Sequence, residues 1–310
     1  MPQKLLITGR TRSGTTFLTN FLNAQEEITL FSDIFHVVAG KFLSQPVQTK
    51  VINYHKKLTS KEKDIYLHYI KVGLEMLGDK TNYKLQVKPE EFTTAKELYE
   101  LLLDSIHKPG DKVVGHKVTE VEINVENILS NTDMKVLYII RDPRDAVLSA
   151  VKKFGNSVFH AVTSWKKAID KILKINSNKL LVIRFEDLIK KDLYLKSKLE
   201  GFLGINIDYN INEAKSHENK SFIGNSSFSD VDKLFDLRAV ERWKNRSEFI
   251  VKYIYMETLD YIQKLGYDYM ELDKNDFSIK QEVDKMKQEH ENLVQRLGKN
   301  KQQINKLLFS

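Results

Sequence analysis

The sequence contains no cysteine, which excludes disulfide bonds and thiolate metal sites from a chain of 310 residues. It also lacks a hydrophobic run long enough to cross a bilayer. Its apolar stretches, such as 136–140 and 180–183, are far shorter than the roughly 20 residues that a membrane helix needs. The N-terminus leads directly into a predicted strand instead of the apolar core of a secretion signal. We therefore expect a cytoplasmic protein without a membrane span.

Repetitive and linker-like segments are also missing. We find no internal repeat and no Gly-, Pro- or Ser-rich stretch that would separate domains. Lysines are scattered among Asp and Glu, and the absence of a long basic run disfavours nucleic acid as a partner despite a net charge of +7. With 41% hydrophobic residues, the chain can bury one sizeable α/β core.

The most informative feature that is present is a strand, turn and helix near the N-terminus. An apolar strand runs into a turn rich in Gly, Ser and Thr, and such a turn directs backbone N–H groups and the helix dipole at a phosphate or sulfate. Gly9 and Gly14 bracket four residues as in a Walker A loop, but Thr15 stands where that loop has its lysine. The cation is Arg12, inside the turn, which favours a ligand other than a triphosphate. An ordinary turn between strand and helix is the structural alternative.

A second motif follows the apolar strand 136–140, which ends in Arg-Asp-Pro-Arg-Asp before a helical run. Helix capping and the first helical turn account for three of these residues, namely Asp142, Pro143 and Asp145. Arg141 is left for another task, and Ser149 falls within reach of the same turn if the helix begins at 143. An arginine beside a hydroxyl group predicts a second phosphate site.

Taken together and in this order, the two motifs resemble the signature of sulfotransferases that use 3′-phosphoadenosine 5′-phosphosulfate (PAPS). In that family the first loop binds the 5′-phosphosulfate, and its residues here are Arg12, Ser13, Gly14, Thr15 and Thr16. The second motif binds the 3′-phosphate through an Arg and a Ser eight positions apart, which are Arg141 and Ser149 here. The carbohydrate, tyrosylprotein and bacterial sulfotransferases are the most similar members. Further matching segments are 115–117, 184–188, 202–204, 226–228 and 242–243.

The resemblance implies PAPS as donor and an in-line transfer of its sulfuryl group to an acceptor hydroxyl, with no metal required. A carboxylate is expected to take the acceptor proton. Asp33 lies at that position, where relatives carry Glu, and His36 is the alternative because the pKa of histidine lies nearer neutrality. Lys117 matches a lysine that contacts the leaving phosphate oxygen, and Arg12 is expected to share the sulfonate charge. Two further cofactor contacts are implied, at Ser227 and Arg242.

The acceptor and two rival classes of function stay open. Hydroxyl groups of glycans come first as acceptors, followed by tyrosyl peptides and small metabolites, and we expect selection by an insertion at about 40–105 and a loop near 217–236. A P-loop kinase-like phosphotransferase would fit the first turn, but the loop lysine and a clear Mg²⁺ ligand are missing. A catalytically inactive scaffold would fit the same fold, and Asp instead of Glu at the base position keeps it open.

The alternation of apolar segments predicts an α/β fold in residues 1–272. Strands are expected at 4–8, 112–115, 136–140 and 180–185. Helices are expected at about 14–24, 123–130, 157–175 and 187–201. A further helix is expected to begin at 144, and one or two more are expected within 238–265. A polar, mainly helical insertion is expected at about 40–105. This pattern predicts a three-layer, P-loop-like fold around a central parallel sheet.

The C-terminal segment 278–308 has a different pattern. With His290 and Asn300 inserted, its apolar residues alternate four and three apart, which is a heptad seam and predicts a coiled-coil helix. His290 and Asn300 at core positions weaken the seam, so we expect a short helix that makes a homo-oligomer, most simply a dimer. An amphipathic helix folded back on its own chain is the alternative.

Overall fold

The computed structural model describes residues 1–32, 35–42, 48–77, 84–155, 157–211, 235–246, 248–269, 281–282, 284–285, 288 and 292. Its contacts divide the chain into two compact units. Unit 1 consists of Met1–Ile140 and Lys171–Leu237, and unit 2 consists of Arg141–Asp170 and Arg238–Ser310.

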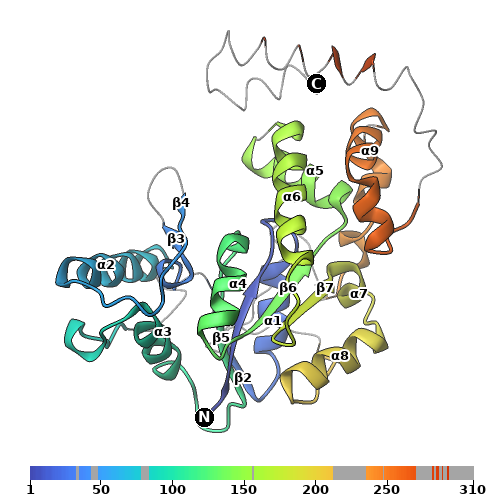
Figure 1. Ribbon diagram of the computed structural model, residues 1–310. Helices are drawn as coiled ribbons and strands as arrows, with labels where there is room; N and C mark the ends of the chain where they lie inside the picture. Colours follow the sequence, from blue (N-terminus) through green and yellow to red (C-terminus); the bar gives the residue numbers. More distant parts are fainter. Residues whose placement is uncertain are drawn as a thin grey trace. The chain divides into compact units, whose positions relative to one another are not determined.

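Unit 1 is built around a five-stranded sheet in which every neighbouring pair is parallel (Figure 1). In order across the sheet, the strands are β2 (Ile28–Ser32), β5 (Val113–Lys117), β1 (Gln3–Thr8), β6 (Lys135–Ile140) and β7 (Leu180–Arg184). Strands β1 and β6 contain continuous apolar runs, at 5–7 and 136–140, because helices cover both of their faces. Because β1 and β5 run parallel as neighbours, their carboxyl ends lie side by side at one edge of the sheet, where parallel sheets bind ligands.

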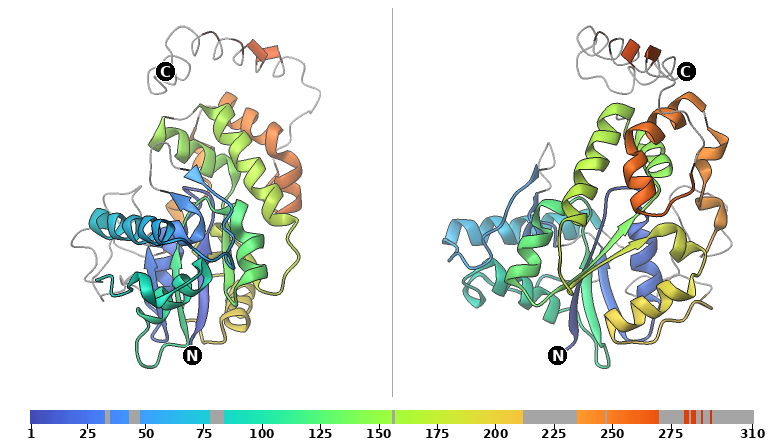
Figure 2. Two further views of the ribbon diagram at one scale, coloured as in Figure 1. Left: turned by 60° about the vertical axis from the view of Figure 1, so that its left-hand side comes forward. Right: turned by 45° about the vertical axis from the view of Figure 1, so that its right-hand side comes forward.

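Helices form a layer on each face of this sheet, which confirms the predicted three-layer α/β fold. In the right-hand view of Figure 2, α1 (Thr15–Asn23) and α8 (Leu193–Leu203) lie on one face, and α3 (Ala95–Asp104) and α4 (Glu122–Asn131) lie on the other. The short helix α7 (Phe185–Ile189) packs beside α1 through an edge-to-face contact between Phe17 and Phe185, whose ring centroids are 6.0 Å apart.

The helix predicted over 187–201 is two helices in the structure. Helix α7 ends at Ile189, and Lys191 adopts a left-handed backbone with a φ of 56°. Asp192 then caps α8, because its carboxylate accepts a hydrogen bond from the backbone N–H of Leu195 at 2.7 Å. A left-handed residue cannot continue an α-helix, so the chain turns between the two segments.

The segment between β2 and β5 contains helices and a small second sheet. Its elements are the 3₁₀ turn η1 (Val37–Ala39), the antiparallel pair β3 (Lys41–Phe42) and β4 (Gln48–Thr49), α2 (Ser60–Leu77), η3 (Pro89–Glu91) and α3. Thr94 caps α3 in a reciprocal capping box with Glu97. The strand β2 itself was not predicted from the sequence.

The described part of unit 2 is helical. Its elements are α5 (Pro143–Phe154), α6 (Val158–Leu173, in this unit up to Asp170), the 3₁₀ turns η4 (Leu237–Ala239) and η5 (Arg242–Asn245), and α9 (Glu248–Lys264). Trp165 of α6 packs edge-to-face on Tyr261 of α9, and the Tyr261 hydroxyl donates to Asp170 at 2.7 Å. Buried side chains of α9 and the residues after it form an apolar cluster, which consists of Tyr255, Leu259, Ile262 and Tyr267.

None of the helices in the described part of the chain is long and apolar enough to span a bilayer. The expected boundary at 272–278 lies outside the described residues, and so does most of the predicted coiled-coil segment 278–308.

Candidate active site

The turn between β1 and α1 has a backbone shaped by two left-handed residues. Arg12 has a φ of 74° and Gly14 a φ of 95°, and the N–H of Ser13 closes the turn onto the carbonyl of Arg10 at 3.0 Å. Helix α1 then begins at Thr15 without a side-chain cap and without an acidic residue in its first turn. The N–H groups at a helix start attract anions, so this turn has the geometry of a phosphate or sulfate site. The predicted sequence of strand, turn and helix is confirmed.

Both glycines of the turn are required by close packing. A Cβ atom on Gly14 would lie 2.3 Å from the ring of Phe185, and one on Gly9 would lie 2.5 Å from the carbonyl oxygen of Ile139. The loop therefore rests directly on β6 and α7, which fixes the start of α1 against the sheet. Ser13 is buried on the inner side of the loop, and Thr16 is exposed.

Lys117 is the last residue of β5, which continues two residues beyond the strand predicted at 112–115. It pairs in register with Ile7 of β1 on one side and with Ser32 of β2 on the other, and it is buried. The turn of residues 9–14 between β1 and α1 is called the phosphate loop. Because β1 runs directly into this loop, Lys117 is held at the same edge of the sheet as the loop.

Glu120, in the loop after β5, was not predicted as a functional residue. Its carboxylate accepts a hydrogen bond from the hydroxyl of Thr11 and lies 3.3 Å from the guanidinium of Arg10. Two positions further on, the buried Glu122 accepts a hydrogen bond from the Tyr138 hydroxyl at 2.9 Å. Burial raises the pKa of Glu122, and the positive charge of Arg10 opposes that increase.

In unit 2, the side chains of Arg141 and Asp145 form hydrogen bonds with the backbone of the segment around η5. The buried guanidinium of Arg141 donates to the carbonyl of Ala239 at 2.5 Å and forms an ion pair with Asp145 at 3.4 Å. Asp145 in turn accepts hydrogen bonds from the backbone N–H groups of Trp243, at 2.9 Å, and Arg242, at 3.4 Å. The sequence indicated a helix-capping role for Asp145, whereas its carboxylate binds the backbone of a distant segment. Asp142 is the cap of α5.

Arg144 was not identified from the sequence, yet it lies at the centre of this arrangement. Its side chain is fully buried and donates three hydrogen bonds to the carboxylate of Asp142, at 2.9, 3.2 and 2.6 Å. The guanidinium carbon lies 3.9 Å from the centre of the Trp243 ring, in a cation–π contact. An arginine can be buried here because a carboxylate and an aromatic face replace its water.

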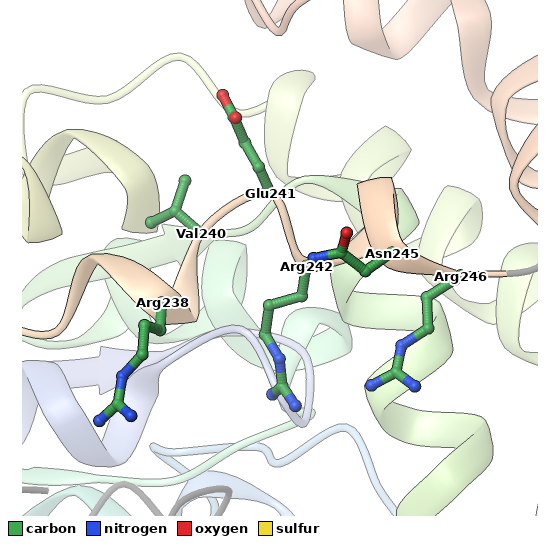
Figure 3. Close-up of a pocket in the computed structure, with 6 residues that line it drawn as sticks. All are labelled: Arg238, Val240, Glu241, Arg242, Asn245 and Arg246. Carbon is green, nitrogen blue, oxygen red and sulfur yellow. The ribbon is translucent and has the colours of Figure 1, made fainter.

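Three arginines line a cavity of about 440 Å³ in unit 2. Figure 3 shows the side chains of Arg238, Arg242 and Arg246 pointing in a common direction, with Glu241 pointing away from them. The pKa of Arg242 is lowered by burial, and the positive charges of Arg141 and Arg246 lower it further. The cavity therefore has an excess of positive charge, which an anionic ligand would relieve. Only Arg242 of the three was predicted as a ligand-binding residue.

Two of the predicted site residues, Asp33 and Ser227, lie outside the described residues. His36 immediately precedes η1, and its carbonyl accepts a hydrogen bond from the N–H of Lys41 at 2.8 Å. Ser149 is a half-buried residue of α5. Among the described residues, no cluster of three or more His, Asp or Glu side chains is placed to hold a metal ion.

Comparison with known proteins identifies the fold and the family. The sulfotransferase domain from the curacin biosynthetic pathway has a TM-score of 0.55 with 17% sequence identity, and the match covers 87% of this chain and 99% of that domain. For the sulfotransferase domain from the Synechococcus PCC 7002 olefin synthase, the TM-score is 0.59, the identity is 16%, and the coverage is 87% and 96%. No curated protein matches the chain.

The sequence profile of the sulfotransferase family matches residues 3–209. These residues are more than half of the chain, and they contain the phosphate loop, Lys117 and the motif of Arg141 and Ser149. The chain therefore belongs to the sulfotransferase family and is an enzyme of sulfuryl transfer.

Proposed function

We propose that this sulfotransferase takes the sulfuryl group from PAPS and transfers it to a hydroxyl group of its acceptor. The start of α1 carries the proposal, because a turn with left-handed Arg12 and Gly14 leads into a helix with no acid in its first turn. A phosphosulfate is an anion of the kind that such a helix start binds.

Two groups of residues are proposed as ligands of the donor. In unit 1, residues 12–16 bind the 5′-phosphosulfate with backbone N–H groups and the Arg12 guanidinium. In unit 2, Arg141, Ser149 and Arg242 bind the 3′-phosphate. The concentration of positive charge at Arg242 supports this second assignment, because a phosphate would offset the mutual repulsion of the arginines.

Bound PAPS supplies an activated sulfuryl group whose leaving group is a phosphate. In the proposed reaction, the bond from sulfur to the acceptor oxygen forms as the bond from sulfur to the phosphate oxygen breaks. Lys117 neutralises charge on that phosphate oxygen, and Arg12 stabilises the oxygens of the sulfuryl group. Asp33 accepts the acceptor proton, with His36 as the alternative. Ser227 contributes a further hydrogen bond to the donor.

We propose a hydroxyl-bearing acceptor, with glycans ahead of tyrosyl peptides and small metabolites. The segment between β2 and β5 is proposed to select the acceptor, because it follows the predicted base along the chain and adds α2, α3 and the small sheet of β3 and β4 to unit 1. The C-terminal segment 278–308 is proposed to self-associate. A chain truncated before residue 278 should then have about half the solution mass of the full chain by light scattering. An unchanged oligomeric state would contradict this.

Calorimetric titration with 3′,5′-adenosine bisphosphate tests the donor. We expect binding by the wild-type chain and a loss of about 10- to 100-fold in affinity for Arg12→Ala, since a hydrogen bond to a charged group contributes about 1.5–3 kcal/mol. Arg242→Ala should weaken binding by a similar factor. Lys166→Ala is the control, because it removes a positive charge from a surface ion pair with Glu257.

A parallel titration uses ATP with Mg²⁺. Failure of the wild type to bind the bisphosphate, or tighter binding of ATP with Mg²⁺, would overturn the proposed donor. Equal losses in the control and the two site variants would show that net charge alone governs the affinity.

A further inference from the structure

Three segments of unit 1 meet at residues 118–120, directly after Lys117. The first is the phosphate loop, the second is the end of β5, and the third is the small sheet of β3 and β4. Backbone hydrogen bonds begin the junction. The N–H of Val118 donates to Ile7 at 3.0 Å, and the N–H of Glu120 donates to Gly9 at 3.1 Å. The parallel pairing of β1 and β5 is thereby prolonged into the loop that follows each strand.

The side chain of Glu120 extends this junction over the phosphate loop. Its carboxylate accepts the hydrogen bond of the Thr11 hydroxyl and forms an ion pair with Arg10 at 3.3 Å. Both partners directly precede Arg12, whose left-handed backbone costs about 1–2 kcal/mol for a residue with a Cβ atom. Contacts made by the residues next to a strained one help to keep such a conformation populated.

The other side of the same segment holds the small sheet. The Lys41 ammonium donates to the carbonyl of Thr119 at 3.0 Å and to its hydroxyl at 3.2 Å, and it lies 4.0 Å from the Glu120 carboxylate. The Thr49 hydroxyl donates to the carbonyl of Glu120 at 3.3 Å. One residue therefore contacts the phosphate loop with its side chain and β4 with its backbone.

The backbone of Glu120 is itself left-handed, with a φ of 62°. Non-glycine residues adopt this conformation rarely, and it recurs where the surrounding structure and function require it. Here it turns the chain after Val118, so that the N–H points to Gly9 while the side chain reaches Thr11.

We propose that Glu120 is a positioning residue for donor binding: it holds the phosphate loop in its anion-binding conformation and at a fixed place relative to Lys117. The inference rests on the proposed donor function of that loop. Glu120 acts through Thr11 and Arg10, and it does not touch the reacting atoms. Its contacts with Lys41 and Thr49 position the small sheet of β3 and β4 relative to the same loop.

The sign of one substitution separates this role from a simple charge effect. Glu120→Gln removes a negative charge beside a site for a polyanion, so electrostatics alone predicts tighter binding of 3′,5′-adenosine bisphosphate. If Glu120 positions the loop, binding weakens instead, because Gln loses the ion pair with Arg10. Glu120→Ala loses the contact with Thr11 as well and should weaken binding further, by about tenfold relative to wild type.

The experiment combines two measurements on full-length chains. The first is the dissociation constant of the bisphosphate for wild type, Glu120→Gln, Glu120→Ala and Thr11→Val, and for Glu120→Ala combined with Thr11→Val. The second is hydrogen exchange of the peptide covering residues 9–16 without ligand. Glu62→Gln is the matched control, because Glu62 also accepts from a threonine, Thr59, and pairs with a lysine, Lys56.

We expect weaker binding and faster exchange of the loop in both Glu120 variants, no change in Glu62→Gln, and a double variant no weaker than Glu120→Ala alone. Unchanged exchange, or tighter binding in Glu120→Gln, would overturn the inference, and a lower melting temperature with an unchanged dissociation constant would also refute it. If wild type does not bind the bisphosphate, the proposed donor is wrong. The exchange measurement still decides whether Glu120 orders the loop.

Discussion

Replacing Gly14 by alanine tests whether the phosphate loop is held in place by its contact with α7. The backbone of Gly14 is left-handed, and an added Cβ atom would lie 2.3 and 2.7 Å from two carbons of the Phe185 ring. The ring is itself buried, at 2% exposure, and packs against Phe17, so it cannot swing aside without displacing its neighbours.

The expected loss of stability has two parts. A left-handed alanine costs about 1–2 kcal/mol, and forcing an extra carbon into packed surroundings costs about 1–3 kcal/mol, which together give about 2–5 kcal/mol. Two other glycines separate these parts. Gly204 has a φ of +70° with nothing within 4 Å of an added Cβ, so Gly204→Ala should cost only the backbone part, about 1–2 kcal/mol. Gly201 lies inside α8 in open space, and Gly201→Ala should stabilise the chain by about 0.5–1 kcal/mol.

Urea unfolding, followed by circular dichroism, measures the three free energies of unfolding. The Phe185 contact is then tested by a double-mutant cycle, in which Phe185→Leu should lower the cost of Gly14→Ala by about 1 kcal/mol or more. If Gly14→Ala is no more destabilising than Gly204→Ala, and the cycle gives no coupling energy, the reasoning about the loop is wrong.

Two further predictions concern buried charges. Arg144→Lys should destabilise the chain by about 2–4 kcal/mol in urea unfolding. Lysine keeps the positive charge, but it loses the paired hydrogen bonds to Asp142 and the planar contact with the Trp243 ring. A loss of less than about 1 kcal/mol would contradict this prediction. The pKa of Glu122 is higher in the folded chain than in the unfolded chain. The folded state therefore loses stability as the pH rises from the pKa of the unfolded chain to that of the folded chain. Glu122→Gln should therefore be more stable than wild type at pH 8, with a difference that shrinks toward acid pH, and a constant or reversed difference would refute the assignment.

The sheet was predictable where strands are long and apolar. Strands β1, β6 and β7 are continuous apolar runs that end in polar turns, and such runs indicate buried strands. Strand β2 (Ile28–Ser32) is as long as β7, but it follows α1 so closely that its short apolar run is also compatible with an extension of that helix. The break between α7 and α8 has no Gly or Pro to announce it, because Lys191 takes the left-handed conformation.

The candidate site was predictable where a motif is local in the sequence. The phosphate loop follows from the glycine spacing and the adjoining strand and helix, all within one short segment. Glu120 and Arg144 were missed for a common reason. The contact from Glu120 to Thr11 spans 109 positions, and Arg144 meets Trp243 from a distant part of the chain. A single sequence carries no signal for partners so far apart, since each residue alone reads as a solvated charge.

The motif at Arg141 shows why spacing locates a residue without fixing its role. The resemblance gives Arg141 to the 3′-phosphate, yet its guanidinium also holds the carbonyl of Ala239 and the carboxylate of Asp145, which binds the backbone of Arg242. Arg141→Ala would thus remove a proposed phosphate ligand and also release the segment that carries Arg242. Loss of bisphosphate binding in that variant alone cannot separate the two effects. Asp145→Asn separates the two effects, because it weakens the hydrogen bonds to the backbone of the segment around η5 and leaves the guanidinium of Arg141 in the chain. Weaker binding in Asp145→Asn would mean that the motif works largely by placing Arg242.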